Sequence, residues 1–194
     1  MRTAYCTFET AMGFCGIAWN DTDGLVLPAY FQLPASSVTE LEDRLSAHCT
    51  HGNSVPPSAI GRVIELAQRH LAGEPQEFLD ISLDLHDLPS FARRVYAFTR
   101  RVPAGETTTY GELARVAGNP GAARAIGVLL ARNPMPLIIP CHRVLAAGGK
   151  PGGFSAHGGL STKSRMLELE GVHLHHLPED QQLELWPVAQ PPAG

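Results

Sequence analysis

The pair Cys141 and His142 lies between an apolar run and a glycine-rich stretch, and these two residues are the clearest candidates for chemistry. A thiol attacks as the thiolate, and an ordinary cysteine has a pKa of about 8.5, so attack at neutral pH needs a neighbouring base. His142 is such a base. Adjacent side chains on an extended segment point to opposite faces, so a bridging water is one route between them. Glu170 can fold back from the last predicted helix to orient the imidazole. A packing role for Cys141 is the alternative.

The net charge of −4 hides an uneven distribution along the chain. Residues 91–171 contain eleven Lys and Arg against four Asp and Glu, a net charge of +7, whereas the other residues contain four against fifteen, a net charge of −11. A basic segment attracts phosphates at long range, and binding them releases counterions. The segment around Cys141 is therefore suited to nucleic acid, although a solvated basic surface has the same composition.

The length of 194 residues suffices for one domain or for two small ones that share a core, and 44% hydrophobic residues is typical of a globular protein. No apolar run approaches the length of a membrane span, and the first residues lack the apolar core of a secretory signal. We therefore expect a cytoplasmic protein with no membrane contact. In a reducing compartment its four cysteines are expected to be free thiols.

Residues 1–88 have the pattern of a small antiparallel sheet with helices. Short apolar segments separated by tight-turn residues are typical of a strand meander, and capping residues before apolar periodic runs indicate helices. The predicted strands are Thr3–Phe8, Phe14–Trp19, Gly24–Phe31 and Phe78–Leu85. The predicted helices begin after Ser37 and after Ser58, and the second ends at Gly73.

Residues 89–171 are predicted to be mostly helical. A first helix is capped by Ser90 and ends before Pro103. Thr109 begins a capping-box pattern in front of a second helix, and a third follows the turn 118–121 and extends to residue 131 or 132. Two short helices around a glycine-containing turn suggest a helix-turn-helix, although many such pairs only build a core.

After this helix pair, the run 137–139 is short, apolar and β-branched, which predicts a buried strand that delivers Cys141 at its end. A glycine-rich loop, 148–159, precedes a last helix capped by Ser161 and stopped by Gly171. The Pro- and His-rich tail 172–194 is expected to be loosely ordered.

A series of motifs in the second half carries a family resemblance. In order they are Val102–Gly105, Thr109–Gly111, Gly118–Gly127, Asn133–Pro134, Ile139–Val144 and Leu169–Gly171. With these motifs, the segment 91–171, about 80 of the 194 residues, resembles the catalytic domain of the O6-alkylguanine-DNA alkyltransferases, also called methylated-DNA–protein-cysteine methyltransferases. The resemblance implies an α+β fold, with an N-terminal ribonuclease H-like sheet domain (1–88) and a catalytic helix-turn-helix domain (89–171).

The resemblance also implies a reaction. Cys141 accepts an alkyl group from O6 of guanine, and from O4 of thymine, in one irreversible transfer that needs no cofactor and no metal. His142 acts as the base through a water, and Glu170 orients and charges it. Asn133 braces the cysteine loop. Tyr110 donates its phenolic proton to the leaving base.

The implied partner is double-stranded DNA that contains O6-alkylguanine, bound by a monomer that is nucleoid-associated if the source is bacterial. The thiol reaches the alkyl carbon only when the guanine leaves the stack, which costs a few kcal/mol that a side-chain plug and phosphate contacts offset. The residues implied to line the base pocket are Thr109, Leu130, Pro136, Gly152, Phe154 and Ser155. Those implied to contact DNA are Arg124, which fills the space of the flipped nucleotide, Ala123, Arg143 and Lys163.

Two features depart from the family pattern. The loop from Gly152 to Gly159 is about two residues longer than the familiar form and has Phe154 where a tyrosine is common, so the resemblance does not fix the range of alkyl sizes. Some family members bind metal through N-terminal cysteines, and here Cys6, Cys15 and the group 48–51 invite comparison. Their spacing fits no zinc pattern, so we expect no metal.

Three other classes of protein share parts of this pattern. Alkyltransferase-like damage-recognition proteins replace the acceptor cysteine, which this chain retains at Cys141. A helix-turn-helix regulator would bind DNA without preferring the lesion. A cysteine hydrolase generally has its histidine far along the chain from its cysteine, whereas His142 is adjacent.

Overall fold

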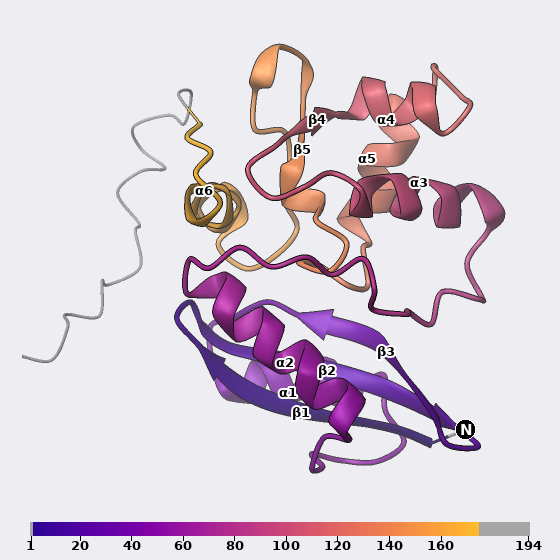
Figure 1. The fold of residues 1–194 in the computed structure, drawn as a ribbon, viewed down its shortest axis with the longest axis vertical. Helices are drawn as coiled ribbons and strands as arrows, with labels where there is room; N and C mark the ends of the chain where they lie inside the picture. Colours follow the sequence, from indigo (N-terminus) through magenta and orange to yellow (C-terminus); the bar gives the residue numbers. More distant parts are fainter. Residues whose placement is uncertain (1, 175–194) are drawn as a thin grey trace, which may run out of the picture.

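The computed structural model describes residues 2–174 as a mixed α/β structure (Figure 1). Its strands are β1 (Arg2–Thr10), β2 (Gly13–Thr22), β3 (Leu25–Gln32), β4 (Thr108–Thr109) and β5 (Val144–Leu145). Its helices are α1 (Val38–Ser46), α2 (Ser58–Leu71), α3 (Ser90–Arg100), α4 (Tyr110–Val116), α5 (Ala123–Ala131) and α6 (Gly159–Leu169), with 3₁₀ turns η1 (Cys141–Arg143) and η2 (Ala147–Gly149). The predicted tail lies outside the described residues from position 175 onward.

The first three strands form one antiparallel sheet in the order β1-β2-β3, which confirms the predicted meander. Tyr5 pairs with Ala18 and packs with α1, whereas the next register pair, Cys6 with Ile17, points to the core shared with α2. Because side chains alternate along a strand, α1 and α2 cover opposite faces of the sheet (Figure 1).

The predicted strand over 78–85 is wrong. Phe78 and Ile81 are buried as the alternation required, but the segment has no regular structure. The guanidinium of Arg100 donates to the carbonyls of Phe78, Leu79 and Ile81, at 2.5, 3.2 and 2.7 Å. Backbone groups that are satisfied by a side chain need no neighbouring strand, so burial here occurs without a ladder.

The helix pair α4–α5 forms as predicted. Thr109 accepts from the Glu112 N–H at 3.1 Å, and the Glu112 carboxylate accepts from the Thr109 N–H at 2.8 Å, which completes the capping box. The chain turns at Gly118, where φ is +82°, a conformation that favours glycine. Helices α4 and α5 then pack against each other.

The predicted strand over 137–139 is also wrong. Leu137, Ile138 and Ile139 are buried, but Leu137 has φ of +77°, which breaks an extended run. The side chain of Asn133 holds the loop, because its Nδ2 donates to the Ile139 carbonyl at 2.8 Å. Cys141 therefore lies on the 3₁₀ turn η1, and only then does β5 pair in parallel with β4.

Several helix starts differ from the prediction by one to three residues. Ser58 and Ser90 are the first residues of α2 and α3, and each follows a proline at the N-cap position, so neither serine caps its helix. Helix α6 begins at Gly159 after Gly158, whose φ is +79°, so Ser161 lies in the first turn. Ser37 does cap α1, because its hydroxyl accepts from Glu40 N–H at 3.1 Å.

The N-terminal sheet and the C-terminal helices share one core. A single cluster joins Phe31 and Ile60 of the first half to Ile126 and Met135 of the second. The Phe31 N–H also donates to the Pro134 carbonyl at 2.8 Å, directly between the halves. All four cysteines are free thiols. Within residues 2–174, no helix combines the length and the apolar character needed to cross a membrane.

Candidate active site

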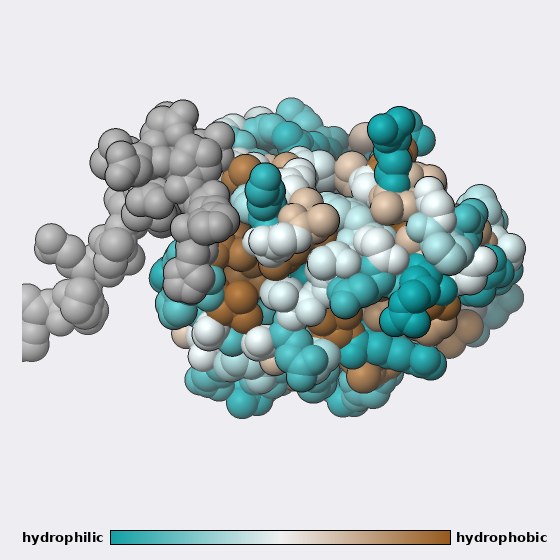
Figure 2. All heavy atoms as spheres, turned by 90° about the horizontal axis from the view of Figure 1, so that it is seen from above, coloured by the Kyte–Doolittle hydropathy of each residue, from teal (hydrophilic) through white to brown (hydrophobic). Residues whose placement is uncertain are grey.

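A cavity of about 780 Å³ opens between α4, α5 and the loop that follows η2, and Cys141 lies on its wall. This volume is within the range of small-molecule sites. The predicted site residues on the wall are Tyr110, Ala123, Arg124, Leu130, Cys141, Phe154 and Ser155. Figure 2 looks down on the end of the molecule that carries these elements, where apolar and polar residues alternate over the surface rather than forming one apolar patch.

Five further residues on the wall were not predicted: Gly111, Gly127, Val128, Ala131 and Ala147; Gly153 also lines the cavity, between residues that were predicted for the base pocket. Three lining residues of α5, Ala123, Gly127 and Ala131, are small and recur every fourth residue, so they share one helix face. This spacing was visible in the sequence and could have identified the wall. Small side chains there let a flat group approach the helix backbone closely.

Cys141 is buried but not sealed, with 8% of its surface exposed. Burial raises the pKa of its thiol above the ordinary value, while hydrogen bonding to Asn133 and the charge of Lys163 act in the opposite direction. The thiol is therefore protonated at rest, and an attack through sulfur requires a base within the site.

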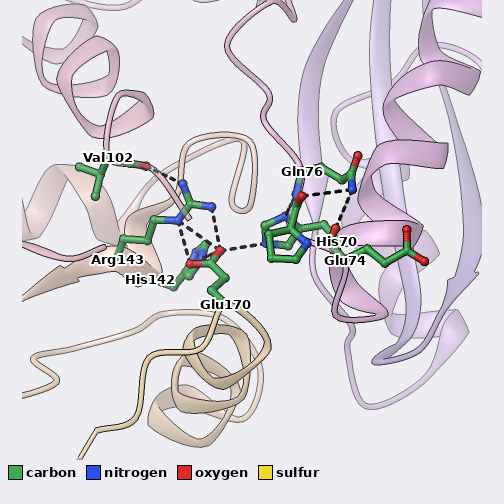
Figure 3. Close-up of polar contacts among 8 residues, drawn as sticks. His70, Glu74, Gln76, Val102, His142, Arg143 and Glu170 are labelled. Carbon is green, nitrogen blue, oxygen red and sulfur yellow. Dashed lines mark hydrogen bonds and ion pairs between the residues drawn. The ribbon is translucent and has the colours of Figure 1, made fainter. Parts of the chain in front are cut away.

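The Glu170 carboxylate accepts hydrogen bonds from several buried side chains, among them His142, the residue after Cys141 (Figure 3). It accepts from Nε2 of His142 at 2.9 Å, from Nε2 of His70 at 2.8 Å, and from Nε and Nη2 of Arg143 at 2.9 and 2.7 Å. Burial alone would raise the pKa of Glu170, but these hydrogen bonds lower it well below its usual range. Glu170 is therefore a carboxylate that only accepts hydrogen bonds.

The protonation of His142 follows from this geometry. Because Glu170 only accepts, Nε2 of His142 carries the proton. Burial lowers the pKa of His142 to about 4, although Glu170 acts to raise it, so the neutral ring has its lone pair on Nδ1. This Nδ1 is buried and has no hydrogen-bond partner among the protein atoms of residues 2–174. His142 thus presents one unengaged basic atom.

Comparison with known proteins identifies the relatives of this chain. Residues 90–172 match the family model described as the 6-O-methylguanine DNA methyltransferase, DNA binding domain. A methylated-DNA–protein-cysteine methyltransferase of Mycolicibacterium paratuberculosis is 44% identical over 117 residues, which cover 60% of this chain and 68% of that protein. One from Mycobacterium bovis is 42% identical over 130 residues, covering 67% and 76%. The chain belongs to the methylated-DNA–protein-cysteine methyltransferase family.

A solved structure supports this membership. The crystal structure of Mycobacterium tuberculosis OGT in complex with DNA has a TM-score of 0.67 and 33% identity, and the match covers 87% of this chain and 93% of that one. The similarity therefore extends through the sheet and the helices, beyond the segment 90–172 that the family model matches.

Two residues that the family resemblance assigned to DNA are buried, which corrects that assignment. Arg143 is 3% exposed, and it pairs with Glu170 and donates to the Val102 carbonyl at 2.5 Å. Lys163 is fully buried, and its Nζ donates to the Val144 carbonyl at 2.6 Å. Burial lowers the pKa of Lys163 to about 8. Both cations are therefore paired inside the protein and are not displayed on its surface for phosphates.

Three residues assigned to the base pocket do not form its wall. The Thr109 hydroxyl is engaged in the capping box, and Pro136 belongs to the loop beneath Cys141. Gly152 stands behind Tyr110, with φ of +67°, and a Cβ there would lie 3.1 Å from Tyr110 Cε2. Gly152 thus supports the ring of Tyr110, whose pKa is raised by burial.

One residue of the network, His70, was not predicted from the sequence. It is separated from Glu170 by 100 positions, and a single histidine in the last turn of an amphipathic helix carries no motif. Only the packing of α2 against α6 brings the two together.

Proposed function

We propose that this chain repairs DNA by moving an alkyl group from O6 of guanine to Sγ of Cys141. The observation that carries the proposal is a buried, hydrogen-bonded pair, His142–Glu170, whose histidine is the residue next to a cysteine that lines an open cavity. The family to which the chain belongs consists of proteins named for the same transfer, and the similar OGT structure was determined with DNA.

The proton path begins at the thiol. In the proposed mechanism a water bridges Sγ of Cys141 and Nδ1 of His142, the one unengaged basic atom of the ring. As the proton passes to Nδ1, the imidazolium is stabilised by the Glu170 carboxylate at 2.9 Å from Nε2. The thiolate then displaces the alkyl carbon from the guanine oxygen. The S–C bond forms as the O–C bond breaks, and the electron pair stays on the oxygen.

Tyr110 is the proposed donor to the leaving guanine. It lines the same cavity as Cys141, and burial raises its pKa, so it keeps its proton at neutral pH. Asn133 supports the reaction by holding the cysteine loop through the Ile139 carbonyl. The resulting thioether has no displacement path back, so the reaction is stoichiometric and needs no cofactor. Transfer from O4 of thymine belongs to the same proposal, because it presents the same alkyl–oxygen bond.

The DNA surface is proposed to be the α4–α5 pair acting as a helix-turn-helix. Arg124 is exposed in the first turn of α5, where the helix dipole disfavours a cation. Its positive charge therefore does not stabilise the helix and is available to bind a phosphate. At the cavity rim it can fill the space of a flipped nucleotide. Ala123, beside it, permits close approach of the duplex.

The remaining predictions about organisation also belong to this proposal. We assign residues 1–88 to a ribonuclease H-like sheet domain and 89–171 to the catalytic domain of a cytoplasmic monomer, which is nucleoid-associated if the source is bacterial. The hydrogen bonds of Arg100 and of His70 across position 88 indicate that these domains fold on each other.

The test is incubation with duplex DNA that contains one O6-methylguanine, followed by intact-mass and peptide analysis. We expect a gain of one CH2 group, localised to Cys141. Cys141→Ser is expected to bind the same duplex and gain nothing. An unmodified wild-type protein, or a Cys141→Ser variant that clears methyl groups, contradicts the proposal.

A further inference from the structure

We propose that His70, contributed by the N-terminal half, is a positioning residue for alkyl transfer, because it fixes the Glu170 carboxylate in the orientation that orients His142. This inference rests on the proposed function of Cys141. It assigns a part in the reaction to α2, a helix outside the segment 90–172 that the DNA-binding family model matches.

The tautomer of His70 is fixed by its surroundings. The ring is 1% exposed, and the backbone N–H of Gln76 donates to its Nδ1 at 2.9 Å. A backbone N–H only donates, so Nδ1 accepts and the neutral ring carries its proton on Nε2. That proton points at Oε1 of Glu170, 2.8 Å away. His70 is thus a directed donor.

Two imidazoles converge on one oxygen. His70, on α2, and His142, on η1, both donate to Oε1 of Glu170, at 2.8 and 2.9 Å (Figure 3). Arg143 contacts both carboxylate oxygens from the same short segment as His142. Without His70, every remaining side-chain donor to Glu170 within residues 2–174 comes from residues 142 and 143. The carboxylate would then move together with residues 142 and 143, and it could no longer hold the His142 ring in one orientation relative to the rest of the protein.

The position of Glu170 makes this anchoring necessary. Glu170 is the residue after the last turn of α6, with φ of −95° and ψ of 4°, so the regular helix no longer holds it. A hydrogen bond from α2 ties this helix end to the N-terminal half. The orientation of the catalytic imidazole therefore depends on how α2 and α6 pack, which the two helices do directly.

A metal ion does not account for the cluster. His70, His142 and Glu170 place three potential ligand atoms within 4.8 Å of one another. Arg143 Nη2, however, lies 2.7 Å from the same Oε1 and adds a positive charge. Both imidazoles present N–H groups to the carboxylate, whereas ligation would require their lone pairs. Hydrogen bonding satisfies all of these atoms without an ion.

The first experiment compares variants of His70 in single-turnover transfer from duplex O6-methylguanine, with DNA affinity measured separately. His70→Leu fills the space without a donor, and we expect the limiting rate constant to fall about tenfold with unchanged Kd. His70→Gln keeps an amide N–H near the Nε2 position and is expected to recover most of the rate. The matched control is Leu71→Ala, which is buried on the same helix, has no hydrogen-bonding side chain to offer Glu170, and should transfer at the wild-type rate.

Three results overturn the inference: a His70→Leu variant that transfers as fast as the wild type, a His70→Gln variant as slow as His70→Leu, or a Leu71→Ala control slowed equally. A wild-type protein that transfers nothing refutes the proposed function instead, so the two failures are distinguishable.

The second experiment uses the unaltered protein and does not depend on any variant folding. Long-range ¹H–¹⁵N spectra of the histidine rings distinguish the two neutral tautomers and the imidazolium. We expect Nε2–H, with Nδ1 unprotonated, for both His70 and His142 at neutral pH. A proton on Nδ1 of His70 overturns the inference.

Discussion

Replacing Glu170 by glutamine changes the charge at the centre of the buried network and almost nothing in its shape. The carboxylate accepts from two histidines and from Arg143, all buried. An amide offers one oxygen and adds an NH2 group that faces another donor. The variant therefore leaves the Arg143 cation buried without its partner.

The magnitude follows from the contacts. Breaking a buried ion pair by removing one partner costs about 3 to 5 kcal/mol, so we expect the free energy of unfolding to fall by about 3 kcal/mol. For the reaction, a hydrogen bond to a charged acceptor contributes about 1.5 kcal/mol more than one to a neutral acceptor. That difference concerns the bond that stabilises the His142 imidazolium, and it corresponds to about tenfold slower transfer.

The dependence on pH has a defined sign. The pKa of Glu170 is lowered in the folded protein, so its stabilisation is present above the unfolded pKa of about 4.3 and is lost as the pH falls below it. The stability difference between wild type and Glu170→Gln is therefore largest at neutral pH and shrinks in acid.

The assay is rapid-quench transfer from a radiolabelled methyl duplex, with urea unfolding of each variant. Glu168→Gln is the matched control, because this carboxylate lies two residues earlier on α6, is 36% exposed, and contacts only residues of its own helix, the Ser164 hydroxyl at 3.1 Å and Arg165 at 3.7 Å. It should change stability by less than about 0.5 kcal/mol and leave the rate unchanged. A folded Glu170→Gln variant with wild-type rate and stability refutes the role given to the carboxylate.

Three further predictions concern the cavity and the base. Arg124→Ala should weaken binding to lesion duplex about tenfold at unchanged thermal stability, since an exposed cation at a helix N-terminus adds nothing to the helix; equal affinity in a fluorescence titration contradicts this. Gly152→Ala should lower stability by about 1 kcal/mol and slow transfer, because its Cβ meets Tyr110 at 3.1 Å with φ of +67°, whereas Gly52→Ala, with open space around its Cβ and no place on the cavity wall, should do neither. Folding lowers the pKa of His142 from 6.5 to about 4, so between these pH values the unfolded chain binds a proton that the folded protein does not. The free energy of unfolding should therefore rise by roughly 3 kcal/mol from pH 4 to 6.5. In urea titrations, His142→Asn should reduce this rise.

Local patterns predicted much of the architecture. Turn residues and alternation placed β1 to β3, and the capping box at Thr109 placed the start of α4. Turns, strand alternation and capping boxes each depend on a few neighbouring residues, so a short stretch of sequence is enough to predict them. Glu170 was also predicted to reach His142, and the two are in contact at 2.9 Å.

The errors occurred where distant groups satisfy the backbone. The alternation at 78–85 correctly predicted burial, but Arg100 supplies the hydrogen bonds that a strand partner would have supplied. The apolar run 137–139 is buried as an irregular loop held by Asn133. The family resemblance likewise implied that Arg143 and Lys163 contact DNA, but both are buried, and a motif does not reveal which charges have partners inside the protein. These outcomes depend on contacts between residues far apart in the sequence, so the local pattern of apolar and polar residues does not predict them.

The site divides into two sides that meet at Cys141. On the cavity side, the small residues of α5 and the loop around Phe154 form the wall that a base must fit. On the buried side, His142, Glu170 and His70 form the hydrogen-bonded network through which we propose that the thiol loses its proton, and none of the three lines the cavity. Because the two sides share only the sulfur, substitutions in the 152–159 loop are expected to change which alkyl groups enter while leaving proton removal intact. Substitution of His70 on α2 should have the opposite effect, slowing the transfer of every alkyl group by the same factor.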